Sequence, residues 1–541
     1  MFLLVCLLLI IYILIFYKSR RYLHMLQQNL YNENNRYLKW LFKNNNTFIE
    51  LDIFLVLLSL VGLILMLDNI SVIFNIILII MIVLSIVVLI HYNNIINKSQ
   101  NKKPFVVTAR IKRLIFTTFI INIIPLIIFI FNHNSTNMIW IILTIISLLV
   151  YLNPLIILIA MFINLPVERL VYHYYKSKAM NKLNSMNNLK VIGITGSYGK
   201  TSSKNILSEI LNVKYNALPT PKNLNTYNGL IMTINNHLDK FNDIFIAEMG
   251  AYVRGEIKGL CKLVKPKYGI LTKIGTAHLE SFGSVENIVK AKFELIESLP
   301  KDGIGVLNKD DKKQREYKLK NNVKIIWISI DEDSDYKATN IKCSSSGTSF
   351  DVIRKKDKKV FSFKTKLLGR HNVYNLLAGI ALGDALGVSM EELIGVVKTI
   401  KPVEHRLELK RLNNFYMIDD AYNSNPDGAK SALDVLSMMD GIKIVVTPGI
   451  IELGSKEYEY NKEFGQNISG VADYAVLIGE KQTEPIKDGL IESGFDKDKI
   501  IVFNDVRDAY TFIQKIVSEN KKDVYALFEN DLPDTYSEGG V

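Results

Sequence analysis

The sequence predicts a membrane-embedded helical region followed by two α/β domains, and three observations lead to this fold class. Long apolar runs are concentrated in the first third of the chain. Further on, short β-branched runs alternate with helical patterns, which is typical of a mostly parallel sheet covered on both faces. A second series of such units begins near Pro402. We therefore expect a transmembrane domain over 1–165, an interfacial linker over 166–187, an α/β domain over 188–401 and a C-terminal Rossmann-like α/β domain over 402–541.

Five apolar runs are long enough to cross a bilayer core, which needs about 20 helical residues. They span approximately residues 1–17, 51–67, 70–90, 114–131 and 138–165. A buried core helix is the alternative for each run, but five in succession with little charge disfavour it. The first run has the position of a signal peptide, yet Lys18, Arg20 and Arg21 follow it and no small-residue cleavage site is visible. We therefore interpret it as a retained anchor.

Basic residues predict the orientation of these spans, since cytoplasmic loops are enriched in Lys and Arg. Such residues follow the first, third and fifth runs, whereas the loops near Asp68 and over 132–137 have none. We expect the N-terminus outside, five spans and all residues from Pro166 onward in the cytoplasm. The protein would then be a multi-pass protein of the cytoplasmic membrane, with the lipid bilayer as a partner. Aromatic and basic residues over 167–187 predict a tether at the membrane interface.

The formal net charge of +12 agrees with this topology and with attraction to anionic lipid. Basic residues interleaved with aromatic ones, as in nucleic-acid-binding motifs, are not visible, so we expect no nucleic-acid partner. The three cysteines are scattered and predict neither a disulfide framework nor a metal cluster, which fits a reducing compartment. Pro125 and Pro154 lie within the apolar runs, but no charged residue lies deep inside them to mark an ion path.

Ten strands are expected in the two α/β domains. The first five are Lys190–Thr195, Asp243–Glu248, Tyr268–Ile274, Ile304–Asn308 and Lys324–Ile330. A small antiparallel patch is expected after them over 337–368, and a helical pattern over 372–397. The second five are Phe415–Asp419, Lys443–Thr447, Tyr474–Ile478, Ile500–Phe503 and Val524–Phe528. Helical patterns between these strands predict parallel sheets in both domains.

The chain is organised around residues 191–205, where a strand leads through a glycine-rich turn into a helix. Backbone N–H groups at such a helix start, aided by the helix dipole, form a site for phosphates. In this turn Lys200 can bridge terminal phosphates, and the hydroxyl of Thr201 can take a Mg²⁺ position. An ordinary strand–turn–helix corner is the alternative, but this spacing favours nucleotide binding. The strict motif has a glycine at the position of Ile194, and here the extra glycine is Gly193.

Further candidates follow other strands, because ligands of parallel sheets sit at the carboxyl ends of strands. Glu248 ends a strand, where its carboxylate could hold the cation that also meets Thr201. A solvated glutamate is an equally good interpretation of this position alone. His278 lies in a glycine-bounded loop after another strand, so a ligand role competes with a structural one. Lys292, on the next helix, has the spacing of a solvated helix lysine.

These motifs resemble the Mur ligase family, and within it the members that add D-alanyl-D-alanine, over about residues 190–454. Thr195, Gly196, Ser197, Gly199, Lys200 and Thr201 match the phosphate loop of the family. Glu248-Met249-Gly250 and His278-Leu279-Glu280 match its next two signatures. The resemblance places Lys292 at the position of a carbamylated lysine. It thus implies ATP and two Mg²⁺ sites, one at Thr201 and Glu248 and one at His278 and modified Lys292.

Later motifs extend the resemblance to both domains. His371, Asn372 and Asn375 resemble the adenine-side motif, and Asn308 with Asp310 resembles an Asn-x-Asp turn. Arg406 and Asp420 resemble the ribose- and phosphate-binding contribution of the third domain of the family. Asn223 and Asn225, with Tyr422 and Asn423, resemble substrate-binding positions. Three departures concern substrate choice: membrane helices replace a uridine-binding domain, Thr226 replaces an asparagine, and the ending after Phe528 is atypical.

The resemblance implies an ATP-dependent, ADP-forming ligase that activates a carboxylate as an acyl phosphate and couples it to an amino acid or dipeptide. Lys200, Lys292, His278 and Arg406 would act in catalysis. The acceptor would be a glycopeptide or lipid-linked precursor of peptidoglycan or another envelope polymer. A synthetase of poly-γ-glutamate or cyanophycin type is the alternative ligase. A non-enzymatic scaffold or transporter gated by ATP is the alternative from another class.

Overall fold

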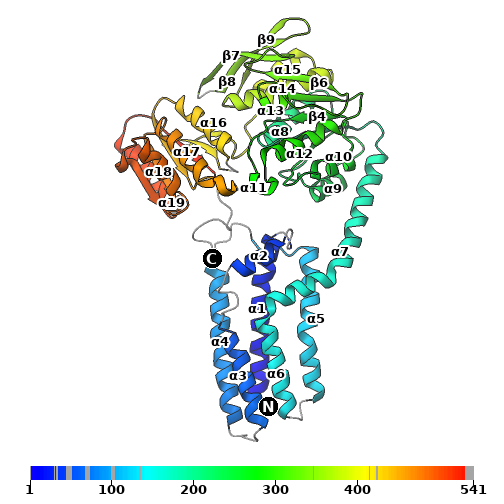
Figure 1. Ribbon diagram of the computed structural model, residues 1–541, viewed down its shortest axis with the longest axis vertical. Helices are drawn as coiled ribbons and strands as arrows, with labels where there is room; N and C mark the ends of the chain where they lie inside the picture. Colours follow the sequence, from blue (N-terminus) through cyan, green and yellow to red (C-terminus); the bar gives the residue numbers. More distant parts are fainter. Residues whose placement is uncertain are drawn as a thin grey trace. The chain divides into compact units, whose positions relative to one another are not determined.

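The computed structural model describes residues 2–29, 31, 35–43, 51–67, 73–98, 104–132, 136–344, 347–412, 415–421, 425–451 and 453–530. They form two compact units, one up to Tyr174 and one from Tyr175 onward, which we describe separately (Figure 1).

The first unit is a bundle of mainly apolar helices (Figure 1). Exposed aliphatic and aromatic side chains such as Ile64, Val83 and Phe116 lie on these helices. The helices are α1 (Phe2–Gln28), α2 (Arg36–Lys43), α3 (Ile53–Leu67), α4 (Phe74–Lys98), α5 (Ala109–Asn132), α6 (Thr136–Tyr151) and α7 (Asn153–Asn184), the last continuing into the second unit. An apolar surface of this extent is typical of a membrane or protein contact.

Four of the described helices are long and apolar enough to cross a membrane, namely those within Phe2–Gln28, Phe74–Ile96, Ala109–Phe131 and Asn153–Asn184. Two shorter apolar helices, Ile53–Leu65 and Asn137–Tyr151, accompany them. The expectation of one continuous run over 138–165 is wrong, because Leu152 separates α6 from α7. Pro154 explains the break, since proline has no N–H to continue the hydrogen bonds of α6 and its ring clashes with the carbonyl four residues earlier, whereas it fits the first turn of α7. The number and orientation of spans stay predictions.

A buried ion pair joins two segments of this helical unit. The ammonium of Lys18, near the middle of α1, contacts the carboxylate of Asp52, which precedes α3, and both side chains are fully buried. The same ammonium lies over the rings of Tyr22 and Tyr92. Removing one partner of such a pair would leave an uncompensated buried charge, so the pair favours one arrangement of these helices.

The second unit contains a nine-stranded sheet in the order β2-β3-β1-β4-β5-β6-β7-β8-β9. Its strands are β1 (Lys190–Thr195), β2 (Ala217–Pro219), β3 (Ile244–Glu248), β4 (Tyr268–Leu271), β5 (Ile304–Asn308), β6 (Lys324–Ser329), β7 (Tyr336–Ser344), β8 (Gly347–Arg354) and β9 (Lys359–Thr365). Strands β1 to β7 pair in parallel, whereas β8 and β9 are antiparallel. The five expected strands and the antiparallel patch are confirmed, and the short edge strand β2 was not predicted.

Helices cover both faces of this sheet and enclose two apolar cores (Figure 1). Helices α8 (Lys200–Leu211), α14 (Arg370–Ala385) and α15 (Met390–Thr399) pack on one face. Helices α9 (Tyr227–Asn236), α10 (Glu256–Val264) and α12 (Val285–Glu297) pack on the other, together with Ala179 of α7. Two short helices, α11 (Leu279–Phe282) and α13 (Lys312–Arg315), follow strand ends.

A six-stranded sheet in the order β10-β11-β15-β12-β13-β14 forms the C-terminal part. Its strands are β10 (Glu408–Arg411), β11 (Tyr416–Asp420), β12 (Ile442–Thr447), β13 (Tyr474–Ile478), β14 (Ile500–Phe503) and β15 (Val524–Glu529), and its helices are α16 (Pro426–Ser437), α17 (Glu457–Ser469), α18 (Glu484–Glu492) and α19 (Val506–Glu519). The five expected strands are confirmed. The antiparallel edge strand β10 was not predicted.

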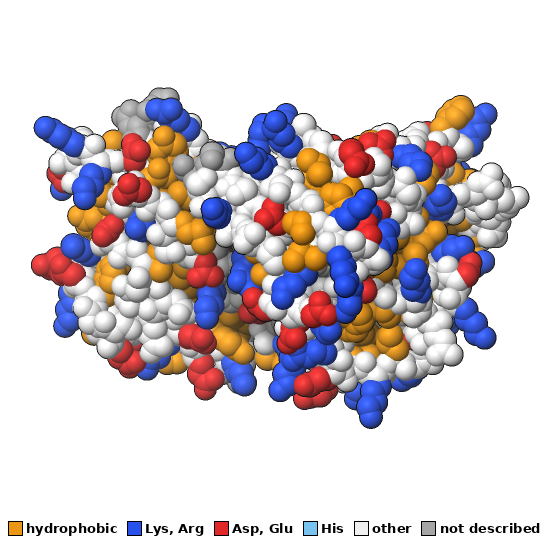
Figure 2. Space-filling view, turned by 90° about the horizontal axis from the view of Figure 1, so that it is seen from above, with side chains coloured by type: hydrophobic (Ala, Val, Ile, Leu, Met, Phe, Trp, Pro, Cys, Tyr) orange, Lys and Arg blue, Asp and Glu red, His pale blue; other side chains and the backbone are white. Residues whose placement is uncertain are grey.

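Charges of both signs are interspersed on the face of the protein that Figure 2 shows. This pattern differs from the single-sign stripe along which a nucleic-acid backbone binds. The expectation that no nucleic acid is bound stays a prediction.

Candidate functional site

A cleft of about 580 Å³ lies between the two sheets of the second unit. Its walls come from the loop between β1 and α8, the ends of β3, β4 and β5, the start of α14, and the C-terminal sheet. Ligands are expected at this place, because the carboxyl ends of parallel strands meet there.

The loop between β1 and α8 has the backbone of a phosphate cradle. Gly199 is the N-cap of α8 with φ of 80°, a conformation that suits glycine. A Cβ atom at Gly196 would lie 1.9 Å from Oγ1 of Thr272, so this position also needs glycine. Ser197, Gly199, Lys200 and Thr201 line the cleft, whereas Thr195 is fully buried and donates its hydroxyl to the carbonyl of Met249.

The ammonium of Lys200 folds back over this loop. It donates to the carbonyl oxygens of Gly196 at 2.9 Å and Ser197 at 3.1 Å. Burial lowers the pKa of Lys200 to about 8, although Glu248 opposes the shift. A nearby anion would raise the pKa of Lys200 again, because negative charge stabilises the protonated form of a lysine.

Glu248 ends β3 opposite the start of α8, and it is almost completely buried. The hydroxyl of Thr201 lies 3.2 Å from both carboxylate oxygens. The amide of Asn225 donates to the same carboxylate at 3.1 Å. A carboxylate beside a hydroxyl and a phosphate cradle fits a hard cation such as Mg²⁺, which takes its other ligands from phosphate and water.

His278 and Lys292 face the same cleft from the next two elements. His278 precedes α11 with φ of 60°, and its ring lies 4.4 Å from that of Tyr252. Lys292, on α12, is almost completely buried with its ammonium 5.5 Å from the ring of Phe282. Burial first and the charge of Lys200 second hold the pKa of Lys292 well below its usual value.

These two residues form no protein-only metal centre as they stand. Among the residues that the structure describes, no group of three His, Cys, Asp or Glu side chains could hold a metal ion. An unmodified amine also brings no oxygen ligand for Mg²⁺. A second Mg²⁺ at His278 and Lys292 therefore fits these residues only if Lys292 carries an added carboxylate.

The start of α14 forms another wall of the cleft. His371 lines it, and burial lowers the pKa of its imidazole to about 4, so the ring is neutral at pH 7. Among the described residues, its buried Nδ1 finds no hydrogen-bond partner, as expected of a group that meets a ligand. Asn308 also lines the cleft. Asn372 does not: its amide donates to the carbonyl of Leu368, and it lines a neighbouring cavity.

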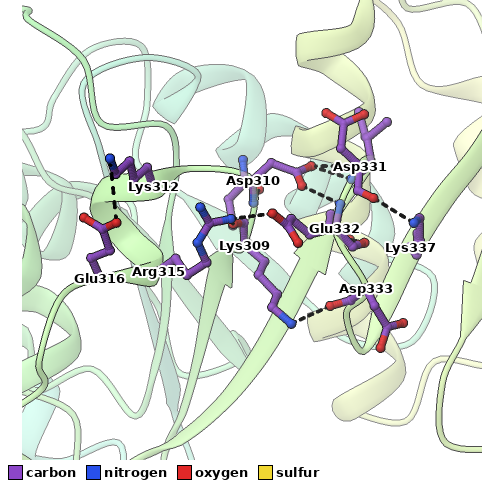
Figure 3. Close-up of polar contacts among 12 residues, drawn as sticks. Lys309, Asp310, Lys312, Arg315, Glu316, Asp331, Glu332, Asp333 and Lys337 are labelled. Carbon is purple, nitrogen blue, oxygen red and sulfur yellow. Dashed lines mark hydrogen bonds and ion pairs between the residues drawn. The ribbon is translucent and has the colours of Figure 1, made fainter.

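Asp310 supports this wall from outside the cleft. Its carboxylate accepts the backbone N–H groups of Asp331 and Glu332 (Figure 3). It also accepts the backbone N–H of Ile330 and the hydroxyl of Tyr374. Burial alone would raise the pKa of Asp310, but the hydrogen bonds from Ile330 and Glu332 hold it below its usual value. The Asn-x-Asp turn expected at Asn308 thus contributes one residue to the cleft and one to its support.

The C-terminal part brings Arg406, which precedes β10, and Asp420, which ends β11, to the cleft. Burial raises the pKa of Asp420 to about 6, against the opposing charge of Arg406. Glu529 lies beside Asp420 on the neighbouring strand β15 and also lines the cleft. A bridge of 2.9 Å between Lys273 and Asp427 joins the two walls.

Most of the predicted site residues therefore meet in one cleft. Asn223 and Asn225 line it beside Glu248, whereas Tyr422 and Asn423 lie outside the described residues. Sequence reasoning missed Lys204 and Glu529, and it assigned no role to the side chain of Tyr198. The spacing of Lys204, four residues after Lys200, could have placed it one helical turn further on the same side of α8.

Comparison with known families gives two matches. The model of the Mur ligase middle domain matches residues 194–383, and that of the Mur ligase glutamate ligase domain matches residues 405–527. Among curated proteins, the UDP-N-acetylmuramoyl-tripeptide–D-alanyl-D-alanine ligase of Bacillus subtilis is 30% identical over 61% of this chain and 71% of its own length. The Escherichia coli ligase of the same name is 31% identical over 58% of this chain and 70% of its own length.

Solved structures agree with these matches. MurF from Acinetobacter baumannii has a TM-score of 0.60 and 27% identity, covering 66% of this chain and 77% of its own. MurF ligase from Thermotoga maritima in complex with ADP has a TM-score of 0.60 and 26% identity, covering 68% and 82%.

Proposed function

This chain belongs to the Mur ligase family of ATP-dependent, ADP-forming ligases, and we propose that it is a membrane-bound member that extends an envelope precursor by an amide bond. Its acceptor is a carboxylate on a glycopeptide or lipid-linked precursor, and its donor is an amino acid or a dipeptide. The relatives are named as ligases of UDP-N-acetylmuramoyl-tripeptide and D-alanyl-D-alanine, which favours a dipeptide donor.

The convergence of Lys200, Glu248, Lys292 and Arg406 on one cleft is the observation that carries this proposal. The loop over 196–199 and Lys200 bind the triphosphate, and Thr201 and Glu248 would hold the first Mg²⁺. Bound Mg²⁺ would neutralise charge that develops as the terminal phosphoryl group moves. Arg406 and Asp420 contact the nucleotide from the other wall, which excludes water from the activated acyl group.

The proposed reaction has two steps. The acceptor carboxylate attacks the terminal phosphorus of ATP, which forms an acyl phosphate and releases ADP. The donor amine then attacks the acyl carbon, which forms the amide, releases phosphate and sets free a proton. Lys200 and the loop amides stabilise the charge on the transferred group.

We further propose that Lys292 is carbamylated. The low pKa keeps its amine neutral and nucleophilic, so that it can add to CO₂ to give a carbamate and a proton. The carbamate would supply the oxygen ligands of the second Mg²⁺ beside His278. It would also place a negative charge near Lys200, which favours the protonated form of that lysine.

The helical unit suggests where the acceptor resides. We propose that α1 and α3 to α7 anchor the enzyme in the cytoplasmic membrane with the cleft in the cytoplasm. An enzyme held at the bilayer meets lipid-linked precursors at high effective concentration. The acceptor is therefore proposed to be lipid-linked.

Purified full-length protein in vesicles, given ATP, Mg²⁺ and D-alanyl-D-alanine, tests this function. Matched soluble and lipid-linked precursors serve as acceptors, and the product is identified by mass spectrometry. We expect one donor to be added to the lipid-linked acceptor, with release of ADP. Turnover of the soluble acceptor alone would contradict the lipid-linked assignment, and a ladder of additions would instead indicate a polymer synthetase.

A further inference from the structure

Lys204 forms a buried connection between the proposed cation position and the substrate loop. It lies on α8, and 2% of its side chain is exposed. Its ammonium is 3.0 Å from Oε2 of Glu248, whose side chain is also 2% exposed. The same ammonium donates to the carbonyl of Lys222 at 2.6 Å.

Lys222 belongs to the loop that carries Asn223 and Asn225. Its φ of 47° places it in the left-handed region, so a firm contact is needed to hold its backbone there. The backbone carbonyl of Asn225 accepts from the N–H of Gly250, two residues after Glu248. The loop is therefore attached to the end of β3 through Gly250 and to α8 through Lys204.

Glu248 consequently has an internal counter-cation. A carboxylate that is paired with an ammonium at this distance presents little net charge to a metal ion. The phosphates of a nucleotide would supply the missing negative charge. Mg²⁺ would then bind Thr201 and Glu248 tightly only together with ATP.

We propose that Lys204 is a positioning residue that reserves the cation position for nucleotide-bound metal and ties this position to the substrate loop. The inference rests on the proposed cation position at Thr201 and Glu248. It concerns the order of binding, which the proposed ligase activity does not determine. In this proposal, Lys204 acts through its contacts with Glu248 and with the carbonyl of Lys222, and it does not touch the reacting atoms.

Nucleotide-free binding of Mn²⁺ to the full-length protein, followed by electron paramagnetic resonance, tests this role. Lys204→Gln removes the charge but keeps a donor of similar shape. We expect Lys204→Gln to bind free Mn²⁺ on the order of tenfold more tightly than the wild type, because the neighbouring positive charge is lost. The double variant Lys204→Gln/Glu248→Gln should lose this gain.

Two control variants test whether the effect on Mn²⁺ affinity comes from the positive charge at position 204 itself. Lys204→Arg keeps the charge and should bind free Mn²⁺ as weakly as the wild type. Lys214→Gln removes an exposed lysine whose ammonium contacts the carbonyl of Gly387, and it should also resemble the wild type. Amide exchange should be faster over 220–226 in Lys204→Gln and unchanged in Lys214→Gln.

An unchanged Mn²⁺ affinity in Lys204→Gln, or a gain that persists without the Glu248 carboxylate, would overturn the proposal. If Lys204→Gln does not fold, the wild type still decides: equal Mn²⁺ affinity with and without ATP contradicts the role of Lys204. Failure of the wild type to bind Mn²⁺ with ATP would instead remove both the proposed function and the cation position on which this inference rests, whereas an unchanged Mn²⁺ affinity in Lys204→Gln removes the inference alone.

Discussion

Two buried lysines with lowered pKa values face the same cleft. Lys200 and Lys292 both lose hydration, and the charge of Lys200 further disfavours the charged form of Lys292. Burying an ammonium without enough nearby negative charge costs free energy, so a bound anion would stabilise the charged form of these lysines. A triphosphate at Lys200 and a carbamate at Lys292 would each supply such negative charge.

Binding of ATP should depend on pH through Lys200. Its pKa of about 8 means that the ammonium is present below pH 8 and is lost as the pH rises through this value. Only the charged form attracts phosphate, so we expect the affinity for magnesium-ATP to fall above pH 8 and binding to take up a proton there. Calorimetry in buffers of different ionisation enthalpy measures both quantities. Lys200→Arg, which stays charged, should lose this pH dependence even if its affinity is lower.

Loss of Lys292 should be partly reversible. Lys292→Ala removes the proposed carbamate, and we expect turnover to fall on the order of a hundredfold or more, as for loss of a group that stabilises transition-state charge. A short carboxylic acid added to the assay should restore part of this activity, because it can occupy the vacated space as an anion. Full activity of Lys292→Ala without added acid would contradict the second Mg²⁺ site.

At the scale of elements, the phosphate loop after β1 packs directly against the loop after β4, which carries His278. The hydroxyl of Tyr198 accepts the N–H of Thr276 at 3.0 Å, two residues before His278. A Cβ atom at Gly275 would lie 2.1 Å from the ring of Tyr198. The loop that bears His278 therefore approaches the phosphate loop closely only because residue 275 is glycine.

Gly275→Ala should displace this loop. We expect a loss of roughly 1–3 kcal/mol in the free energy of unfolding, as for other overpacked sites. Turnover should fall as well, because the loop carries His278. Gly275→Ala/Tyr198→Ala gives the added methyl group space, and it should regain stability relative to the sum of the single changes. Strict additivity of the two stability changes, measured by thermal unfolding, would show that the residues do not interact.

At the scale of the whole molecule, the chain combines an apolar helical unit with a ligase unit. Two sources of membrane affinity are possible in principle, namely insertion of helices and attraction of a basic protein to anionic lipid. They respond differently to salt, since ionic attraction is screened within about 8 Å at physiological ionic strength and burial of apolar surface is not.

Extraction of cell membranes distinguishes these two sources. We expect the full-length protein to stay in the membrane fraction at high salt and to be released only by detergent, because four of its described helices are long enough to insert. A peripheral protein of the same cell serves as the control that salt releases. If salt alone released the full-length ligase from the membrane fraction, the membrane-spanning assignment would be contradicted.

The sequence alone was sufficient for the architecture of the ligase unit. Alternating strand and helix patterns, together with Gly199, Lys200 and Thr201, identified the sheets and the phosphate loop because these signals lie within a few consecutive residues. The edge strands β2 and β10 escaped prediction, since they contain three and four residues and depend on their neighbours for pairing.

Only the tertiary structure decided how distant residues act together. The spacing of Lys292 is that of a solvated helix lysine, but folding buries it beside Phe282 and within the field of Lys200. The role proposed for Lys204 likewise depends on its contacts with Glu248 and Lys222, which belong to other segments of the fold. Burial and electrostatic coupling arise from contacts between remote segments, and a local pattern of residues does not contain them.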